Sequence, residues 1–216
     1  MLTEKLTDAL RAIAASMQTP VIIVLLILIA VAIVMAGTLI AELITEKRHM
    51  KVKLPELLNA LQKGERPAEE IITESGLLKR QKNALLTVLA QRELTPLKRE
   101  SLAGELMEAE ADHYDFRVKI TDLVMRLGPM FGLLGTLIPL GPGIIALGRG
   151  DTYTLSESLL TAFDTTIAGL IAAAVATVIS MIRKRWYARY MGNLGAVMES
   201  LLEVMEHDEQ METEEA

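Results

Sequence analysis

The charged residues of this chain leave three long stretches almost free of charge, and this pattern limits the fold more than any other feature. The first stretch lies between Arg11 and Glu42, and a helix from 20 to 41 would be apolar on every side. A helix of about 20 apolar residues crosses the roughly 30 Å hydrocarbon core of a bilayer. Residues 1–19 carry acidic as well as basic side chains, which is not typical of a cleaved signal peptide. We therefore predict a retained transmembrane helix at 20–41.

Two further spans follow in the second half of the chain. Positions 127–148 contain no charged residue, and positions 158–182 contain only one, Asp164. Both stretches are long enough to cross a bilayer. The connector 149–157 is so short that the two helices must form an antiparallel hairpin. The predicted fold class is an all-α membrane protein with three transmembrane helices and a helical cytoplasmic region.

Lysine and arginine are unevenly distributed between the spans. Residues 42–126 hold 15 of the 22 basic residues, and four more lie within 183–216 after the third span. The connector 149–157 contains only Arg149. Loops rich in basic residues stay on the cytoplasmic side of a membrane. We therefore predict a multi-pass protein of the cytoplasmic (inner) membrane, with 1–19 and the connector outside and with 42–126 and the C-terminal 183–216 inside.

The predicted cytoplasmic loop is mostly helical. Apolar spacing and turn residues indicate helices at 54–62, 67–75 and 79–92. Pro96 starts a long helix that runs into the second span and is expected to kink near Pro129. The loop has few apolar residues for an enzyme core, so we expect it to pack against sister subunits.

Composition argues against several functions. The chain has no cysteine, and its three histidines, His49, His113 and His207, are far apart in sequence. We therefore expect no metal site, no cofactor and no enzymatic activity, and the chain also lacks a glycine-rich phosphate loop. No basic patch is interleaved with aromatic residues, which argues against nucleic-acid binding. The stretch 203–216 carries seven acidic and no basic residues and is expected to be a solvated, frayed end, with a docking role as the alternative.

The second span is unusually rich in glycine and proline. Each internal proline removes a backbone donor and displaces the carbonyl four residues earlier, which in lipid then needs protein or water as a partner. Thr136 adds a hydroxyl group in the middle of the span. The span is either a kinked helix whose glycines allow close packing or a pore-lining helix with a hydrated polar side. The residues concerned are Gly128, Pro129, Gly132, Gly135, Pro139 and Pro142.

One face of the third span is small and weakly polar. At helical spacing it includes Thr165 and Gly169, which suit either tight packing or a narrow aqueous path. Asp164 is the only acid in this span, and an acid inside a membrane costs roughly 2.5–3.5 kcal/mol, so that it is a candidate functional residue. It is either a relay acid for protons or an interfacial side chain that reaches water, or it pairs with Arg149 or with a cation of a partner.

Two sequence motifs lie within these spans. The segment 127–136 reads LGPMFGLLGT, and the segment 163–170 reads FDTTIAGL and is followed by an alanine-rich run. The first matches a proline-hydrophobic-GLLGT pattern and the second a Thr-x-x-Gly-Leu pattern. Together with the three spans and the large cytoplasmic loop, they resemble the MotA/TolQ/ExbB family of proton-channel subunits over roughly residues 120–190.

The resemblance implies a homo-oligomer, a pentamer around a pore, with a single-span ExbD-like or TolR-like partner that carries a titratable aspartate. It places the pore-lining threonines of the family at Thr136 and at Thr166, with Thr165 as the neighbouring alternative. TolQ and ExbB carry an acid about five residues before the third-span threonine, which would fall on Thr161. In this chain Asp164 lies nearer to that threonine.

The predicted function is that of a proton-channel subunit in a stator-like motor complex driven by the proton motive force. Proton flow would be coupled to mechanical work through the single-span partner. Two alternatives fit the same residues. One is a non-conducting membrane scaffold with small residues for packing, and the other is a subunit of a substrate transporter with proline-broken helices around a midplane site.

Overall fold

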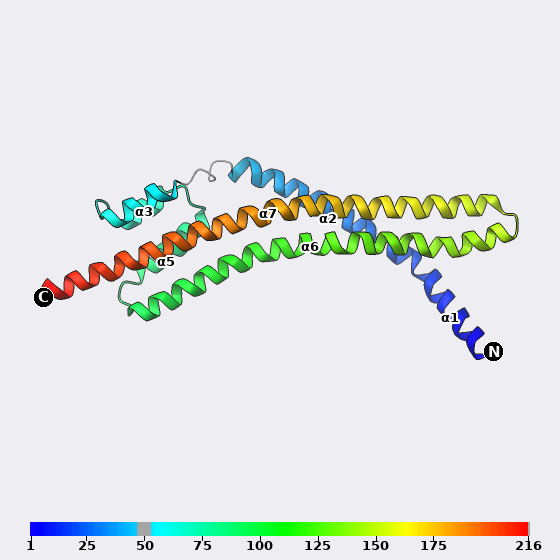
Figure 1. The fold of residues 1–216 in the computed structure, drawn as a ribbon, viewed down its shortest axis with the longest axis horizontal. Coiled ribbons are helices and arrows are strands. Elements are labelled where there is room, and N and C mark those ends of the chain that lie inside the picture. The colour runs from blue at the N-terminus through cyan, green and yellow to red at the C-terminus, as the bar shows by residue number, and fades with distance from the viewer. Residues whose placement is uncertain (47–52, 216) are drawn as a thin grey trace. The chain divides into compact units, whose positions relative to one another are not determined.

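The computed structural model describes residues 1–46 and 53–215 (Figure 1). Within these ranges every regular element is an α-helix and no strand occurs, which confirms the predicted all-α class. The elements are α1 (Leu2–Ser16), α2 (Gln18–Glu46), α3 (Leu54–Lys63), α4 (Ala68–Glu74), α5 (Lys79–Ala90), α6 (Pro96–Gly148) and α7 (Thr152–Glu215).

Three helical segments are long and apolar enough to cross a membrane, as predicted. Helix α6 has 53 residues and α7 has 64, so at about 1.5 Å per residue each is far longer than the roughly 30 Å core of a bilayer. Helix α6 confirms the single long helix predicted to run into the second span, and it stays helical through its three internal prolines. The three segments are Leu2–Ile44, Pro96–Gly148 and Thr152–Met211.

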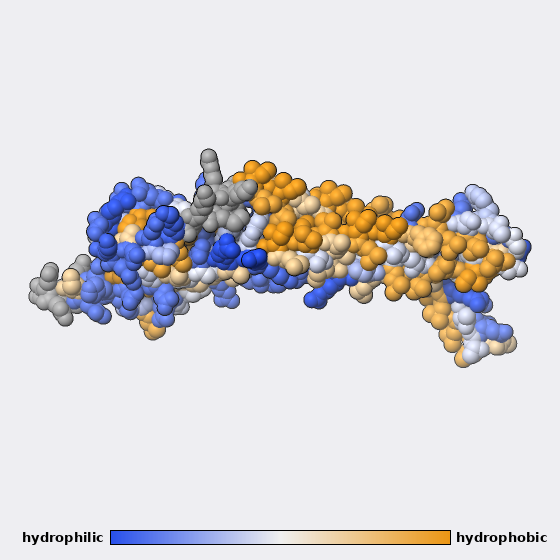
Figure 2. Space-filling view, turned by 45° about the horizontal axis from the view of Figure 1, so that its top comes forward, coloured by the Kyte–Doolittle hydropathy of each residue, from blue (hydrophilic) through white to orange (hydrophobic). Residues whose placement is uncertain are grey.

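The chain divides into two compact units. Unit 1 comprises residues 1–40 and 118–182, and unit 2 comprises residues 41–117 and 183–216. Helices α6 and α7 each pass from one unit into the other without interruption. Hydrophobic side chains gather on the surface of the spans in unit 1, whereas hydrophilic side chains cover much of the surface around α3 in unit 2 (Figure 2).

In unit 1, α2 buries one stripe of its apolar surface. The buried positions recur every three or four residues, which is the spacing of a single helix face. Other sides of the helix expose large apolar residues such as Ile27 and Ile33. The helix therefore packs within unit 1 along one face and leaves apolar surface for lipid or for another protein. The buried residues are Val21, Leu25, Leu28, Ala32, Met35 and Leu39.

Unit 2 has its own hydrophobic core. Ile72 of α4 and Leu85 of α5 are fully buried in it, together with Leu194 and Leu201 from the C-terminal part of α7. Within the chain, α7 covers these apolar faces of the loop, because it presents an apolar stripe far beyond the end of its membrane span. Packing of the loop against sister subunits stays a prediction.

The acidic C-terminal stretch is helical as far as Glu215. Met205 is buried in the core of unit 2, and Glu209 forms an ion pair with Arg99, whose side chain is only 1% exposed. The expectation of a frayed end is therefore wrong for 203–211, which are helical, whereas most side chains of this stretch are exposed, as expected. The high acidic content of this stretch concealed a helix in which Met205 packs into the core, while Met211 is exposed.

The helix ends follow local sequence signals closely. Gly64 ends α3 with a φ of +62°, a left-handed conformation that favours glycine. Helix α4 begins at Ala68, so that Pro67 is the residue before the helix rather than its first residue. Helix α7 begins at Thr152, so that most of the predicted connector 149–157 is helical.

Candidate functional site

Helices α6 and α7 pack against each other in unit 1 through small residues. The buried positions on each helix recur every three or four residues and form one stripe. Small side chains allow two helix backbones to come close together. We call the two stripes together the glycine seam. It consists of Gly128, Gly132, Gly135, Pro139 and Gly143 of α6 and of Ala162, Thr165, Gly169, Ala172 and Ala176 of α7.

The two backbones are in direct contact within the glycine seam. A Cβ atom added to Gly128 would lie 2.6 Å from the carbonyl oxygen of Gly169. A Cβ atom added to Gly135 would lie 2.5 Å from the Cβ of Thr165. A Cβ atom on Gly169 would in turn collide with the carbonyl oxygen of Gly128. Glycine at these positions therefore sets how closely the two spans approach.

The three candidate threonines differ in their surroundings. Thr165 is buried in the glycine seam, and its hydroxyl donates to the carbonyl oxygens of Thr161 at 2.9 Å and of Ala162 at 3.0 Å. Thr136 and Thr166 are half-buried, and each hydroxyl donates to a carbonyl of its own helix, at 2.7 and 3.1 Å respectively. The hydroxyl protons are thus engaged within the helices, whereas the hydroxyl oxygens keep their capacity to accept.

Asp164 is exposed on α7 and lines a hollow of about 420 Å³ in unit 1. The hollow brings Asp164 together with two other predicted residues, Pro139 and Pro142 of α6. It also contains Glu157, a second acid that the sequence analysis did not select. Helical spacing contains the signal for Glu157, because residues seven positions apart lie on the same helix face. The remaining lining residues are Gln18, Thr154, Ser158, Leu160 and Thr161.

The turn between α6 and α7 holds one end of this hollow in place. Gly150 has a φ of +77°, a conformation that favours glycine. Asp151 caps α7, since its carboxylate accepts hydrogen bonds from the backbone nitrogen of Thr154 at 3.0 Å and from the Thr154 hydroxyl at 2.6 Å. The hydrogen bond from that hydroxyl lowers the pKa of Asp151 below its usual value. The positive end of the helix dipole of α7 then stabilises the charged carboxylate.

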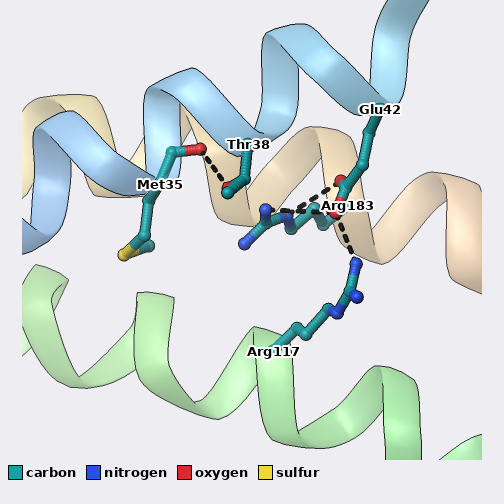
Figure 3. A network of polar contacts seen from close by, with 5 residues as sticks. All are labelled: Met35, Thr38, Glu42, Arg117 and Arg183. Atoms are coloured by element: carbon teal, nitrogen blue, oxygen red, sulfur yellow. Dashed lines mark hydrogen bonds and ion pairs between the residues drawn. The ribbon is translucent and has the colours of Figure 1, made fainter. Parts of the chain in front are cut away.

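Glu42 connects three helices within unit 2 (Figure 3). Its Oε1 accepts from Nη1 of Arg117 at 2.6 Å, and its Oε2 accepts from Nε of Arg183 at 3.3 Å. The side chains of Glu42 and Arg183 are 12% and 5% exposed. The three residues come from α2, α6 and α7, and each lies within two residues of the point where its helix passes between the units. We call these residues the Glu42 cluster.

The sequence analysis did not identify the Glu42 cluster. It used Glu42 and Arg183 only to mark the ends of the first and third spans. The two residues are 141 positions apart, and no local pattern relates them. Only the packing of the three helices brings the carboxylate between the two guanidinium groups.

Most of the helices described above lie in a region that matches a known protein family. A family model described as the MotA/TolQ/ExbB proton channel family matches residues 68–196, which is more than half of the 216 residues. The chain belongs to this family. A search of the curated proteins returned no match.

The region shared with the MotA/TolQ/ExbB family begins at α4 and ends within α7. It therefore includes the whole glycine seam and every candidate residue of the second and third spans, whereas α1, α2 and α3 precede it. Family membership and three helices capable of spanning a membrane make the chain a multi-pass membrane protein and a subunit of the proton-channel type.

The glycine seam of this MotA/TolQ/ExbB family member can be tested by adding one methyl group. Gly135→Ala is expected to lower the free energy of unfolding by about 1–3 kcal/mol, because the new Cβ would overlap the side chain of Thr165. Gly141→Ala is the matched control, since it lies on the same helix and has no neighbouring atom within 4 Å. Denaturant unfolding of the purified full chain in mild detergent measures the free energy of unfolding of both variants. Equal stability of the two variants would contradict the close packing.

Proposed function

We propose that this chain is one of five identical subunits of a proton channel in the inner (cytoplasmic) membrane. In this proposal the complex is a stator-like motor that couples proton flow to mechanical work through a single-span ExbD/TolR-like partner. The observation that carries the proposal is the family match over α4 to α7, which contains both packed spans. The chain would act without a metal, a cofactor or enzymatic activity of its own.

The proposed energy source is the movement of protons through the membrane potential. One elementary charge that crosses 100 mV releases about 2.3 kcal/mol. A carboxylate becomes neutral when it takes up a proton, passes an apolar surface in that form, and is charged again after the proton leaves. Asp164 or the acid of the partner would be this group, and the hydroxyls of Thr136 and Thr166 would serve as relay positions, because a hydroxyl both donates and accepts.

The distribution of apolar surface supports assembly into an oligomer. A single copy leaves Asp164 exposed beside large apolar side chains, and in lipid an uncovered acid is costly. Sister subunits or a partner that cover this side would remove that cost. The exposed apolar residues of the two spans include Met130, Leu133, Leu137, Ile144, Leu160, Phe163, Ile167, Leu170 and Ile171.

The distribution of charge supports an orientation. The basic residues collect in 42–126 and after the third span, so that the N-terminus and the turn at Gly150 would lie outside and the C-terminus would lie in the cytoplasm. Unit 2 would then be the cytoplasmic part of the subunit.

A second candidate function is that of a non-conducting scaffold in the membrane. The observation in its favour is that the hydroxyls of Thr136, Thr165 and Thr166 all donate within their own helices, while the glycine seam joins the two spans closely. In that case the polar residues would serve packing alone, and the assembled complex would carry no proton current.

The two candidates are separated by purification and reconstitution of the complex. An affinity-tagged full chain purified from its native membranes is expected to bring down a single-span protein with an acid inside its span. Native mass spectrometry of that complex in detergent is expected to give five copies of this chain. Liposomes that contain the complex are expected to take up protons when a membrane potential is imposed.

Each result has a clear meaning for the proposal. A purified chain that remains monomeric would overturn the oligomer, and the absence of a single-span partner would overturn the coupling. An assembled complex with its partner but without proton uptake would support the scaffold instead.

A further inference from the structure

Two groups of polar side chains on the α6–α7 hairpin in unit 1 lie apart along α7. One group surrounds the hollow that contains Asp164. The second group lies toward the other end of the hairpin in unit 1 and consists of Thr121, Asp122, Thr177 and Ser180, which we call the inner polar group. Between the two groups, residues 167–176 of α7 carry neither a hydroxyl nor a charge. Ten helical residues correspond to about 15 Å.

Asp122 and Ser180 form a direct contact between the two helices. The hydroxyl of Ser180 donates to Oδ1 of Asp122 at 2.7 Å. Ser180 is 3% exposed and the adjacent Thr121 is fully buried, while Asp122 is half-buried. The carboxylate of Asp122 thus accepts a hydrogen bond from a buried hydroxyl, and its exposed part can still exchange a proton with its surroundings.

The contact suits a group that changes its protonation state. Ser180 donates to the ionised carboxylate, and the same hydroxyl can rotate and accept a hydrogen bond when the carboxyl group carries a proton. The two helices therefore stay joined in both states. Hydroxyl groups alone cannot take this role, because they do not titrate near neutral pH.

We propose that Asp122 is the proton acceptor at the cytoplasmic end of the pathway and that Ser180 positions it. This inference rests on the proposed proton-channel function and its orientation. A carboxylic acid of the single-span partner loses its proton to the Asp122 carboxylate, so that the partner becomes charged and Asp122 becomes neutral. Asp122 then releases the proton to cytoplasmic water and returns to the carboxylate, which completes one transfer.

The position of Asp122 gives a reason for a second acid on this chain in addition to Asp164. It lies five residues before the start of the predicted span 127–148, and Ser180 lies two residues before the end of the span 158–182. The stretch without hydroxyls or charges separates this end from Asp164. A proton carried past that stretch on the partner therefore requires a new acceptor at the inner end.

The test compares three variants of the full chain, each co-purified with its single-span partner and reconstituted in liposomes. Asp122→Asn keeps the shape and the acceptor oxygen for Ser180 but cannot take up a proton. We expect it to assemble and to lose roughly 100-fold in proton flux. Asp122→Glu restores an acid and should recover part of the flux. Ser180→Ala removes the contact but keeps the acid, and should lower the flux less than Asp122→Asn does.

Assembly measured by native mass spectrometry separates the inference from a purely structural role. Wild-type flux by assembled Asp122→Asn would overturn the inference and leave the channel function intact. Loss of assembly in both Asp122→Asn and Asp122→Glu would also overturn it, because the carboxylate would then serve packing. An assembled wild-type complex that conducts no protons would instead refute the proposed function itself.

Discussion

Replacing Glu42 by alanine is expected to lower the free energy of unfolding by about 3–5 kcal/mol. The change leaves the guanidinium groups of Arg117 and Arg183 without the carboxylate between them, and Arg183 is only 5% exposed. A buried charge that loses its partner keeps its full cost of desolvation. The chain contains a single tryptophan, Trp186, which is half-buried on α7 three residues after Arg183. Its fluorescence during denaturant unfolding in mild detergent therefore reports on this region.

The control for this prediction is an ion pair on the surface. Lys53 and Glu56 form a 2.7 Å pair in which the side chains are 72% and 68% exposed. Glu56→Ala is expected to change the free energy of unfolding by less than about 1 kcal/mol, because exposed ion pairs contribute little. Glu42→Gln should fall between the two, since it keeps an acceptor oxygen but loses the charge. Similar unfolding curves for Glu42→Ala and Glu56→Ala would show that the Glu42 cluster does not stabilise unit 2.

The second large effect is expected at Asp164. Asp164→Asn keeps the size of the side chain and its ability to form hydrogen bonds but removes the group that takes up protons. If Asp164 relays protons as proposed, flux through the assembled complex in liposomes should fall roughly 100-fold. Asp164→Glu should recover part of the flux, because it returns the acid on a longer side chain.

Glu157 is the matched control for Asp164. It lines the same hollow and lies on the same helix face, seven residues closer to the turn between α6 and α7. Glu157→Gln removes an equal charge and is expected to leave most of the flux. Full flux by assembled Asp164→Asn would exclude the relay and assign the titrating group to the partner. Dissociation of the complex by Asp164→Asn would indicate a charge pair with a basic residue of the partner, because Arg149 lies at the turn between α6 and α7, far along the hairpin from Asp164.

The sequence alone was enough to predict the span-forming helices and the helices of the loop, although helix α1 was not predicted. Three stretches nearly free of charge predicted the three span-forming helices, because a mostly apolar chain segment of about 20 residues has few stable alternatives to a helix in lipid. Local signals also placed several helix ends, as Gly64 and Pro96 illustrate. The motifs around Thr136 and Thr166 indicated the family that the comparison then identified.

The tertiary structure decided how these elements face one another. The sequence marked Gly135 and Thr165 as candidates, but only the packing of α6 on α7 shows that they contact each other in the glycine seam. Periodicity defines the faces of a helix without saying which partner each face meets. For the same reason, the Glu42 cluster and the contact between Asp122 and Ser180 were not predicted, since each joins residues from helices far apart in the chain.

The acidic C-terminal stretch shows the same limit for composition. Its average charge predicted a frayed end, but the position of each residue on α7 decided the outcome. Met205 falls on the face that meets the core of unit 2, while Glu209 falls beside the buried Arg99. Local sequence thus determined where the helices lie along the chain, and the long-range contacts between their faces determined the core, the ion pairs and the candidate proton acceptors.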